Sequence, residues 1–349
     1  MLYILIISLS LLSIGIINYL LNKNKIIIES LSNDERKIHT QEVARVGGLT
    51  FLPVILTIFF ISDETLKSII LYSYLFLALG LYEDLFNILD KYFRLFLIII
   101  LIIIVIDEHS LTINQFDNNI LDLIFTHNLF LSFIFSILGL LILINGFNFV
   151  DGLNGLLLGI TIIIISFYAF YLFGKSDDLF ILCLSLISAC AVLFFFNFFY
   201  GRILAGDGGS YLLGFLVAVI SIFVANANIL DPFTIACIIY FPAIELVFTF
   251  FRRILVEKAN PFLPDNSHMH QLIFIILNKK RNDSGKLSNN SLSSLIVLSY
   301  ILAVVSFSMI CVSIFNPLYI FFIINFLYVV TYIKISTYKN SLVNLSSNP

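Results

Sequence analysis

Eleven separate stretches of this chain are long and apolar enough to cross a membrane as helices, which leaves few other folds open to it. A helix needs about 20 mostly apolar residues to cross the hydrocarbon core of a bilayer. Of the 349 residues, 60% are hydrophobic and 12% are charged, against about 25% charged in a soluble domain. We therefore predict an all-α, polytopic integral membrane protein of about 10–11 transmembrane helices, forming a single domain over residues 1–349. The segments lie near residues 2–21, 46–62, 66–82, 93–107, 129–147, 153–174, 179–200, 210–226, 232–251, 295–315 and 317–335.

Lysine and arginine are distributed very unevenly over the connections between these segments. With the segments placed as above, 17 of the 19 basic residues fall on one side of the membrane, and Lys67 and Lys175 fall on the other. Cytoplasmic connections carry the excess of basic residues in membrane proteins. We therefore predict a multi-pass protein of the inner (plasma) membrane with its N-terminus outside. The first segment lacks a basic start and a small-residue cleavage site, so we interpret it as an uncleaved helix.

The polar residues that are unusual for a membrane protein lie on the same, cytoplasmic side. Ionisable residues close to the hydrocarbon are costly, so they indicate function by default. Five polar connections converge on that face, which predicts one active site facing the cytoplasm. The net charge of −3 gives no basic surplus, so nucleic acid is not an expected partner. The five polar stretches are residues 33–48, 80–94, 145–155, 197–215 and 252–272.

The fourth of these stretches places a carboxylate, Asp207, between Gly206 and the pair Gly208-Gly209. Glycines let the backbone approach a ligand closely and leave its N–H groups available to oxyanions. Mg²⁺ is often held by one or two carboxylates together with substrate phosphates. The alternative is an ordinary turn with a solvated aspartate, and the other connections decide between the two.

Two further acidic stretches can likewise be interpreted either as ordinary structure or as part of a functional site. Glu83 and Asp84 are either solvated charges at a helix end or a pair that binds a cation or accepts a proton. Asn148 and Asp151 are three residues apart, so they share a helical face. They are either a helix cap or the place of a metal ligand.

The fifth connection combines basic residues and imidazoles. His268 and His270 lack a third ligand at metal-like spacing, so hydrogen bonding to phosphate fits them better than zinc. Arg252 and Arg253 suit either an interfacial anchor or a phosphate contact. Glu245 is the one acid deep within a segment, and we expect it to pair with a basic neighbour.

The predicted site combines clustered acids, basic residues and glycine-rich backbone, and it is open to both cytosol and lipid. Such a site suits phosphoryl transfer from a nucleotide-linked donor to a lipid phosphate. Catalysis of that kind is mostly positioning and electrostatic stabilisation. A secondary transporter is the main alternative, but its coupling acids should lie near the middle of the bilayer. An enzyme of the CDP-alcohol phosphotransferase type is a second alternative. Asp151-Gly152 is similar to part of that motif, but the Asp-Gly-x-x-Ala-Arg run is missing.

From about Asp34 to Leu272 the chain resembles the polyprenyl-phosphate N-acetylhexosamine-1-phosphate transferases (glycosyltransferase family 4), with all five connections in the family's order. Glu83-Asp84 resembles the family's paired acidic motif, with Asn87 three residues beyond it. Asn145, Asn148, Asp151 and Gly152 match Asn-x-x-Asn-x-x-Asp-Gly, and Asp207 matches the metal loop. The first connection resembles the family through Arg36, Lys37, His39, Arg45, Gly47 and Gly48, and the fifth through His268 and His270.

The resemblance implies transfer of a sugar 1-phosphate from a UDP-N-acetylhexosamine to polyprenyl (undecaprenyl) phosphate, with release of UMP. It implies Mg²⁺ as cofactor, with Mn²⁺ as a substitute, and allows a homodimer. It assigns catalysis to Glu83, Asp84 and Asp207, and the metal to Asp207 and Asn148. The substrate-binding residues that we expect are Arg45, Lys91, Arg94, Asn145, Asp151, Arg202, Arg252, Arg253, His268 and His270.

The chain departs from the family pattern at three positions. Glu83 replaces the commoner Asp, Asn154 stands where many members carry Asp, and Gln271 stands where many carry the last His. The triple His of the peptidoglycan branch is therefore absent. The motifs look most like the branch that initiates O-antigen-type polysaccharides, whose donors include UDP-N-acetyl-6-deoxyhexosamines as well as UDP-GlcNAc.

Overall fold

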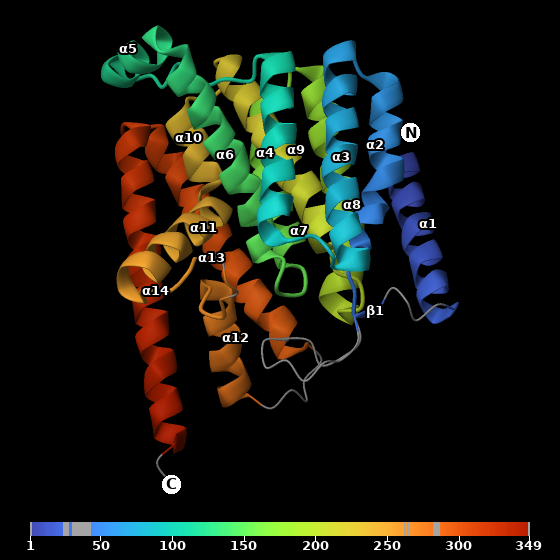
Figure 1. Ribbon diagram of the computed structural model, residues 1–349, viewed down its shortest axis with the longest axis vertical. Helices are drawn as coiled ribbons and strands as arrows, with labels where there is room; N and C mark the ends of the chain where they lie inside the picture. Colours follow the sequence, from blue (N-terminus) through green and yellow to red (C-terminus); the bar gives the residue numbers. More distant parts are fainter. Residues whose placement is uncertain are drawn as a thin grey trace.

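Helices make up nearly all of the computed structural model, which describes residues 2–23, 28–29, 43–261, 263, 265–281 and 287–347. Most of them run side by side along the long axis of the molecule (Figure 1). The two short strands pair antiparallel, with Ile28 opposite Ala44. In chain order the elements are α1 (Leu2–Lys23), β1 (Ile28–Glu29), β2 (Val43–Ala44), η2 (Gly47–Phe51), α2 (Leu52–Ile61), α3 (Glu64–Phe86), α4 (Lys91–His109), α5 (Asn119–His127), α6 (Leu129–Val150), α7 (Leu156–Leu172), α8 (Asp177–Tyr200), α9 (Gly206–Asn226), α10 (Pro232–Ile238), α11 (Tyr240–Phe251), η3 (Arg252–Val256), α12 (Met269–Lys280), α13 (Asn289–Val312) and α14 (Pro317–Ser347).

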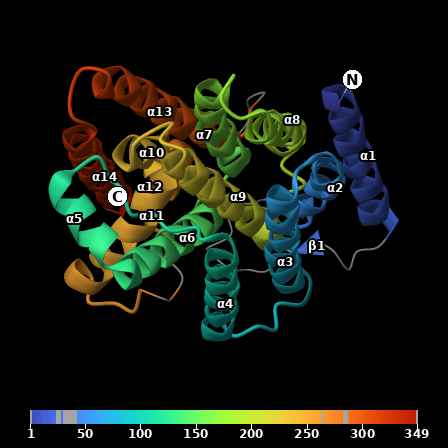
Figure 2. The ribbon, with the colours of Figure 1, turned by 90° about the horizontal axis from the view of Figure 1, so that it is seen from above.

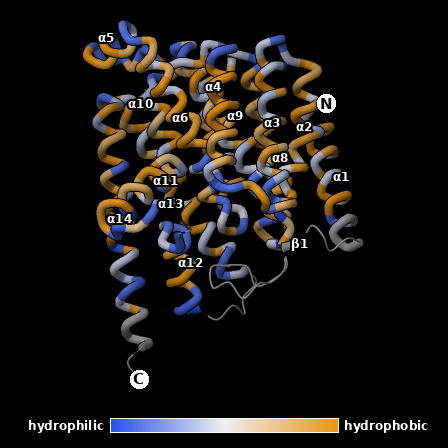
Figure 3. Tube along the Cα trace, viewed as in Figure 1, coloured by the Kyte–Doolittle hydropathy of each residue, from blue (hydrophilic) through white to orange (hydrophobic). Residues whose placement is uncertain are grey.

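Each of the predicted apolar segments coincides with a helix or with a pair of consecutive helices, so the prediction of an all-α polytopic protein is confirmed. Within the described residues, six helices are long and apolar enough to cross a membrane, or up to seven if a bent pair counts as one span. Apolar residues dominate the middle of the bundle, and hydrophilic residues gather towards its ends (Figure 3). The six helices are α3, α6, α8, α9, α13 and most of α14.

The predicted segment at 232–251 is present, but it is divided into two helices. The chain breaks at Ile239, and α10 meets the piece formed by α11 and η3, Tyr240–Val256, at 83°. Pro242 explains the break, because it has no N–H to donate to the carbonyl of Ile238 and its ring would clash there. Two helices were not predicted, α5 and α12, because they have 9 and 12 residues and are too short for a span.

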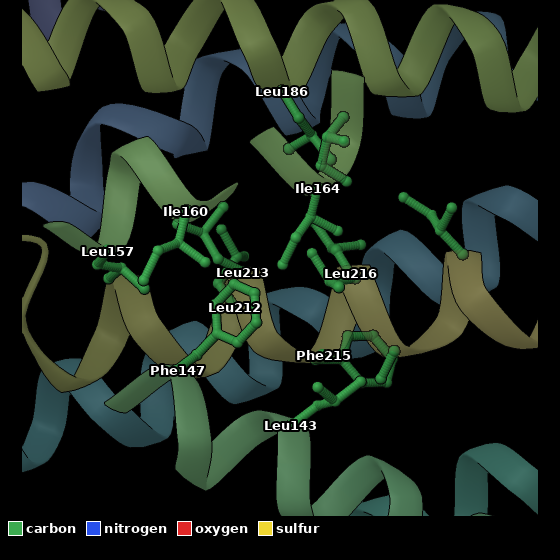
Figure 4. Packing of buried hydrophobic residues seen from close by; sticks show 14 of the residues in the cluster. Leu143, Phe147, Leu157, Ile160, Ile164, Leu186, Leu212, Leu213, Phe215 and Leu216 are labelled. Carbon is green, nitrogen blue, oxygen red and sulfur yellow. The ribbon is translucent and has the colours of Figure 1, made fainter. Parts of the chain in front are cut away.

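Helix α9 lies at the centre of the bundle, between α3, α6 and α7 (Figure 2). Leu212 and Leu213 of α9 lie among Phe147 of α6 and Ile160 of α7 (Figure 4). On another face Phe215 stacks on Phe76 of α3, with ring centroids 4.5 Å apart. Burial on all sides fixes the position of α9, and with it the position of the polar residues at its first turn.

The backbone leading into α9 is held by a second segment. The N–H of Ala44 donates to the carbonyl of Arg202 over 2.9 Å, and the N–H groups of Gly47 and Gly48 donate to Leu204 and Ala205 over 2.8 and 2.9 Å. The first and fourth polar connections therefore lie side by side.

Candidate functional site

Asp207, in the first turn of α9, lies between side chains from two other helices. Its Oδ2 accepts a hydrogen bond from the guanidinium of Arg94 in α4 over 3.0 Å. Its Oδ1 accepts from Nδ2 of Asn148 in α6 over 2.8 Å, and the same amide reaches Oγ of Ser210 over 3.1 Å. The structure thus brings together residues from the second, third and fourth polar connections.

Glu83 shares Arg94 with Asp207. Its Oε1 lies 3.5 Å from the guanidinium, and its Oε2 accepts from the N–H of Leu89 over 3.2 Å. The turn between α3 and α4 makes this possible, because Asn87 adopts a left-handed conformation and Asp90 caps α4. Both carboxylate oxygens of Glu83 therefore have a partner within the α3–α4 turn and α4.

Two other acids accept hydrogen bonds from buried backbone N–H groups at the start of α9. Oδ2 of Asp84 accepts from the N–H of Gly208 over 3.0 Å, and Oδ2 of Asp151 accepts from the N–H of Gly206 over 2.8 Å. The first N–H groups of a helix have no partner within it, and the helix dipole favours negative charge there. Both carboxylates therefore have a structural reason to be where they are. Oδ1 of Asp84 is buried without a hydrogen-bond partner among the described residues.

Gly80 allows α3 and α9 to approach closely. A Cβ at this position would lie 2.4 Å from the backbone carbonyl carbon of Asp207 and 2.4 Å from the nitrogen of Gly208. Gly206 has φ +73°, a conformation that favours glycine. These two glycines bring the carboxylate of Asp84 to the first turn of α9.

Burial raises the pKa of Asp151 from its ordinary value to about 7. The hydrogen bond from Gly206 and the charge of Arg45 act in the opposite direction and lower that pKa, whereas the charge of Asp207 raises it. Arg45 is itself exposed beside the start of α9. Asp151 is therefore close to its midpoint of ionisation at neutral pH.

The imidazoles of the fifth connection lie against the end of α6. The His268 and His270 rings stack in parallel with centroids 5.6 Å apart, and Phe149 meets His268 edge to face at 5.2 Å. A Cβ at Gly152 would lie 3.0 Å from Nε2 of His270. Burial lowers the pKa of His270 to about 4, so this ring is neutral at pH 7.

Glu245 pairs with a basic neighbour, as predicted. It is fully buried in α11, and its Oε2 lies 3.2 Å from Nδ1 of His268. Its Oε1 accepts from the N–H of Met269 over 3.1 Å. The Oε1 of Gln271 accepts from the N–H of His268 over 3.3 Å, so Gln271 helps to cap α12.

The remaining predicted substrate residues differ in their surroundings. Arg252 binds Glu257 and Asp265, and Arg253 donates to the carbonyl of Leu263. Their assignment to substrate binding stays a prediction. Lys91 at the start of α4 lies over the ring of Tyr92, Asn145 donates to Leu141 in its own helix, and Arg202 is exposed.

Sequence reasoning missed several residues that shape the site. Ser210 and Gly80 were overlooked, although Ser210 directly follows the glycine run of the fourth connection. The sequence around Gly80 does not indicate its contact with α9, because the residues that it contacts are far away in the chain. Three residues of the predicted first motif, Arg36, Lys37 and His39, lie outside the described residues.

The fold and site together define a multi-pass α-helical membrane protein whose helix ends gather an acidic site around one central helix. Comparison of the sequence with known proteins identifies the family within this class. The sequence model of the family described as glycosyl transferase family 4 matches residues 66–225. The undecaprenyl-phosphate alpha-N-acetylglucosaminyl 1-phosphate transferase of Thermotoga maritima is 30% identical over 241 residues, covering 68% of this chain and 70% of the relative.

Two other relatives carry similar descriptions. The probable undecaprenyl-phosphate N-acetylglucosaminyl 1-phosphate transferase of Bacillus subtilis is 28% identical over 273 residues, which cover 75% of this chain and 74% of the relative. The undecaprenyl-phosphate alpha-N-acetylglucosaminyl 1-phosphate transferase of Escherichia coli K12 is 34% identical over 137 residues, 37% of each chain. The chain belongs to glycosyl transferase family 4, the polyprenyl-phosphate N-acetylhexosamine-1-phosphate transferases, as its motifs predicted.

Proposed function

We propose that this protein transfers an N-acetylhexosamine 1-phosphate from a UDP-sugar to undecaprenyl phosphate. The observation that carries the proposal is the convergence of Asp207, Arg94 and Asn148 at the first turn of α9, in a chain whose relatives are described as transferases of this kind. In the reaction a phosphate oxygen of the lipid attacks the phosphorus that bears the sugar. The anhydride bond to the nucleotide phosphate breaks, UMP leaves, and undecaprenyl-diphosphate-sugar forms.

The acids at the site suit a divalent cation that is completed by substrate. No group of three or more His, Cys, Asp or Glu among the described residues is arranged to hold a metal ion by itself. Mg²⁺ commonly takes one or two protein carboxylates and fills its other positions with phosphates and water. The buried, unpartnered Oδ1 of Asp84 near the first turn of α9 is a place where positive charge would be stabilising.

We assign the ion to Asp207, with Asn148 beside it. Bound Mg²⁺, or Mn²⁺ in its place, would neutralise charge on the donor's diphosphate. Arg94 would share that role from the other side of Asp207, because a guanidinium is well suited to phosphate oxygens. Glu83 is our candidate base for the lipid phosphate, whose second ionisation lies near pH 6, about as for other phosphate monoesters.

The remaining features of the proposal concern setting and substrate. We place the site at the cytoplasmic face of the inner membrane with the N-terminus outside, from the distribution of lysine and arginine. The motif forms favour a donor such as UDP-GlcNAc or a UDP-N-acetyl-6-deoxyhexosamine. The product would then begin an envelope polysaccharide such as O-antigen.

A panel of UDP-N-acetylhexosamines tests this proposal. Purified protein in detergent or nanodiscs should release UMP only when undecaprenyl phosphate, Mg²⁺ and an accepted UDP-sugar are all present. UMP release without formation of a lipid-linked sugar diphosphate, or no release with any member of the panel, would reject the proposed function.

A further inference from the structure

Two connections that carry the acids of the site lie against one another. The α6–α7 connection, residues 151–155, begins with Asp151, and the α8–α9 connection, residues 201–205, leads directly into Gly206 and Asp207. Asp151 bridges them through its bond to the N–H of Gly206. A short backbone shift in either connection would therefore move the acids relative to each other.

Asn197, in the last turn of α8, contacts the backbone of both connections. Its Oδ1 accepts a hydrogen bond from the N–H of Gly155, and its Nδ2 donates to the carbonyl of Ile203 over 2.6 Å. The residue is 2% exposed, so water cannot easily replace either partner. A carboxamide offers a donor and an acceptor on one rigid group, which two backbone groups of opposite kind require here.

The N-terminus of α13 binds both the α6–α7 connection and the last turn of α8. The N–H of Asn154 donates to Oδ1 of Asn290 over 2.6 Å, and Oγ of Ser291 donates to the carbonyl of Phe198 over 2.6 Å. Asn154, Asn290 and Ser291 are buried, and Oδ1 of Asn154 and Nδ2 of Asn290 have no hydrogen-bond partner among the described residues. Buried hydrogen-bonded networks of this kind favour a single geometry, because a broken member leaves an unsatisfied polar group.

We infer that Asn197 is a positioning residue of the proposed transferase, which fixes the α6–α7 and α8–α9 connections in one geometry and so keeps Asp151 and Asp207 in register. The inference rests on the proposed function for its catalytic consequence. Asn197 makes no hydrogen bond to Asp207. It acts through Ile203, three residues before Gly206, and through Gly155, four residues after Asp151.

Asn197→Asp is the sharpest test, because it keeps the size of the side chain. The variant can still accept from Gly155, but it turns an oxygen towards the carbonyl of Ile203 in place of a donor. Tyr168→Phe is the matched control, since it removes a buried hydrogen bond of 2.6 Å to Ser221 between α7 and α9, away from both connections. Thermal stability and amide hydrogen exchange are measured for both variants and the wild type.

We expect Asn197→Asp to speed exchange in peptides covering residues 151–156 and 201–207, and Tyr168→Phe to leave those peptides unchanged. The kcat of Asn197→Asp should fall about 100-fold, as expected for a small displacement of reacting groups, with KM for the UDP-sugar changed less than about threefold. Unchanged exchange in both connections would overturn the inference. Faster exchange with wild-type kcat would also overturn it, because the two hydrogen bonds of Asn197 would then stabilise the fold without affecting catalysis. An inactive wild type would instead refute the proposed function. The exchange data would still show whether Asn197 holds the two connections together.

Discussion

The guanidinium of Arg94 lies 3.0 Å from the carboxylate of Asp207, although 113 positions separate the two residues in the chain. The same guanidinium lies 3.5 Å from Glu83. One cation therefore holds together two carboxylates that would otherwise repel each other. It also leaves Asp207 oriented by Arg94 on one oxygen and by Asn148 on the other.

Replacement of Arg94 should show whether the site needs a guanidinium or only a positive charge at this position. We expect Arg94→Ala to lower kcat/KM by roughly 100-fold or more, since it removes the charge that the proposed mechanism places against the donor's phosphates. Arg94→Lys should recover only part of that loss, because an ammonium lacks the planar fork. UMP release at saturating lipid measures both, and a Lys variant as active as wild type would show that charge alone is needed.

Asp84 combines a charge with a helix-capping role, and two substitutions separate them. Asn at this position can still accept from the N–H of Gly208, so Asp84→Asn should fold with near wild-type stability but lose most transfer activity. Asp84→Ala loses the cap as well and should cost about 0.5–2 kcal/mol in the free energy of unfolding. Thermal unfolding and transfer assays on the same preparations measure the two effects. Equal activity of Asp84→Asn and wild type would show that the negative charge of Asp84 is not needed for transfer.

Gly80 tests whether close packing of α3 against α9 matters for the site. Gly80→Ala would place a methyl group against the backbone of Asp207 and Gly208, and overpacking of this kind costs roughly 1–3 kcal/mol. We expect lower stability and a large loss of kcat, because Asp207 must shift. Gly139→Ala in α6 is the control, since its added Cβ meets nothing within 4 Å. Loss of activity in both variants alike would contradict the packing argument.

Asp151 and His270 should affect stability in opposite directions as the pH changes. The folded state keeps the proton of Asp151 up to about pH 7, whereas the unfolded state releases it near its ordinary value of 3.8, so this group lowers stability as pH rises through that window. The unfolded state binds a proton at His270 below 6.5, but the folded state does so only near 4, so this group lowers stability as pH falls from about 6.5 to about 4.

Single substitutions should therefore tilt the pH profile of stability in opposite ways. Asp151→Asn should make the protein less stable on acidification from pH 6.5 to 4, relative to wild type, and His270→Asn should make it relatively more stable. Each slope is at most about 1.4 kcal/mol per pH unit, and the part-exposed Asp151 should give the smaller one. Melting temperatures measured across this range check the signs, and parallel profiles for all three proteins would refute the assignment.

The sequence predicted the helical segments well because each is a long apolar run, and lipid-facing helices need nothing more specific. It did not predict the break at Ile239, since Pro242 lies within an apolar stretch that is long enough for a span. Helices α5 and α12 were missed because short helices depend on their packing and caps rather than on hydrophobic length.

The candidate site was predictable in its residue types but not in its pairings. Asp207 and Glu83 stood out as acids among apolar residues, yet their common partner Arg94 follows from the packing of α3, α4 and α9. For Asp84 the sequence left solvated charge or chemistry open, and for Asp151 a helix cap or a metal site. It could not show that both carboxylates accept N–H groups of α9. Long-range contacts of this kind carry no local pattern.

The account depends most directly on Asp207. Transfer by purified wild type and Asp207→Asn should be compared over a Mg²⁺ titration, with UMP and lipid-linked sugar diphosphate measured together and folding checked by thermal unfolding. We predict that the folded Asn variant loses transfer by a factor of about 1,000 or more, because removal of one principal carboxylate weakens both the ion and the charge balance around it. A folded Asp207→Asn protein that retains most of its activity at limiting Mg²⁺ would contradict the account.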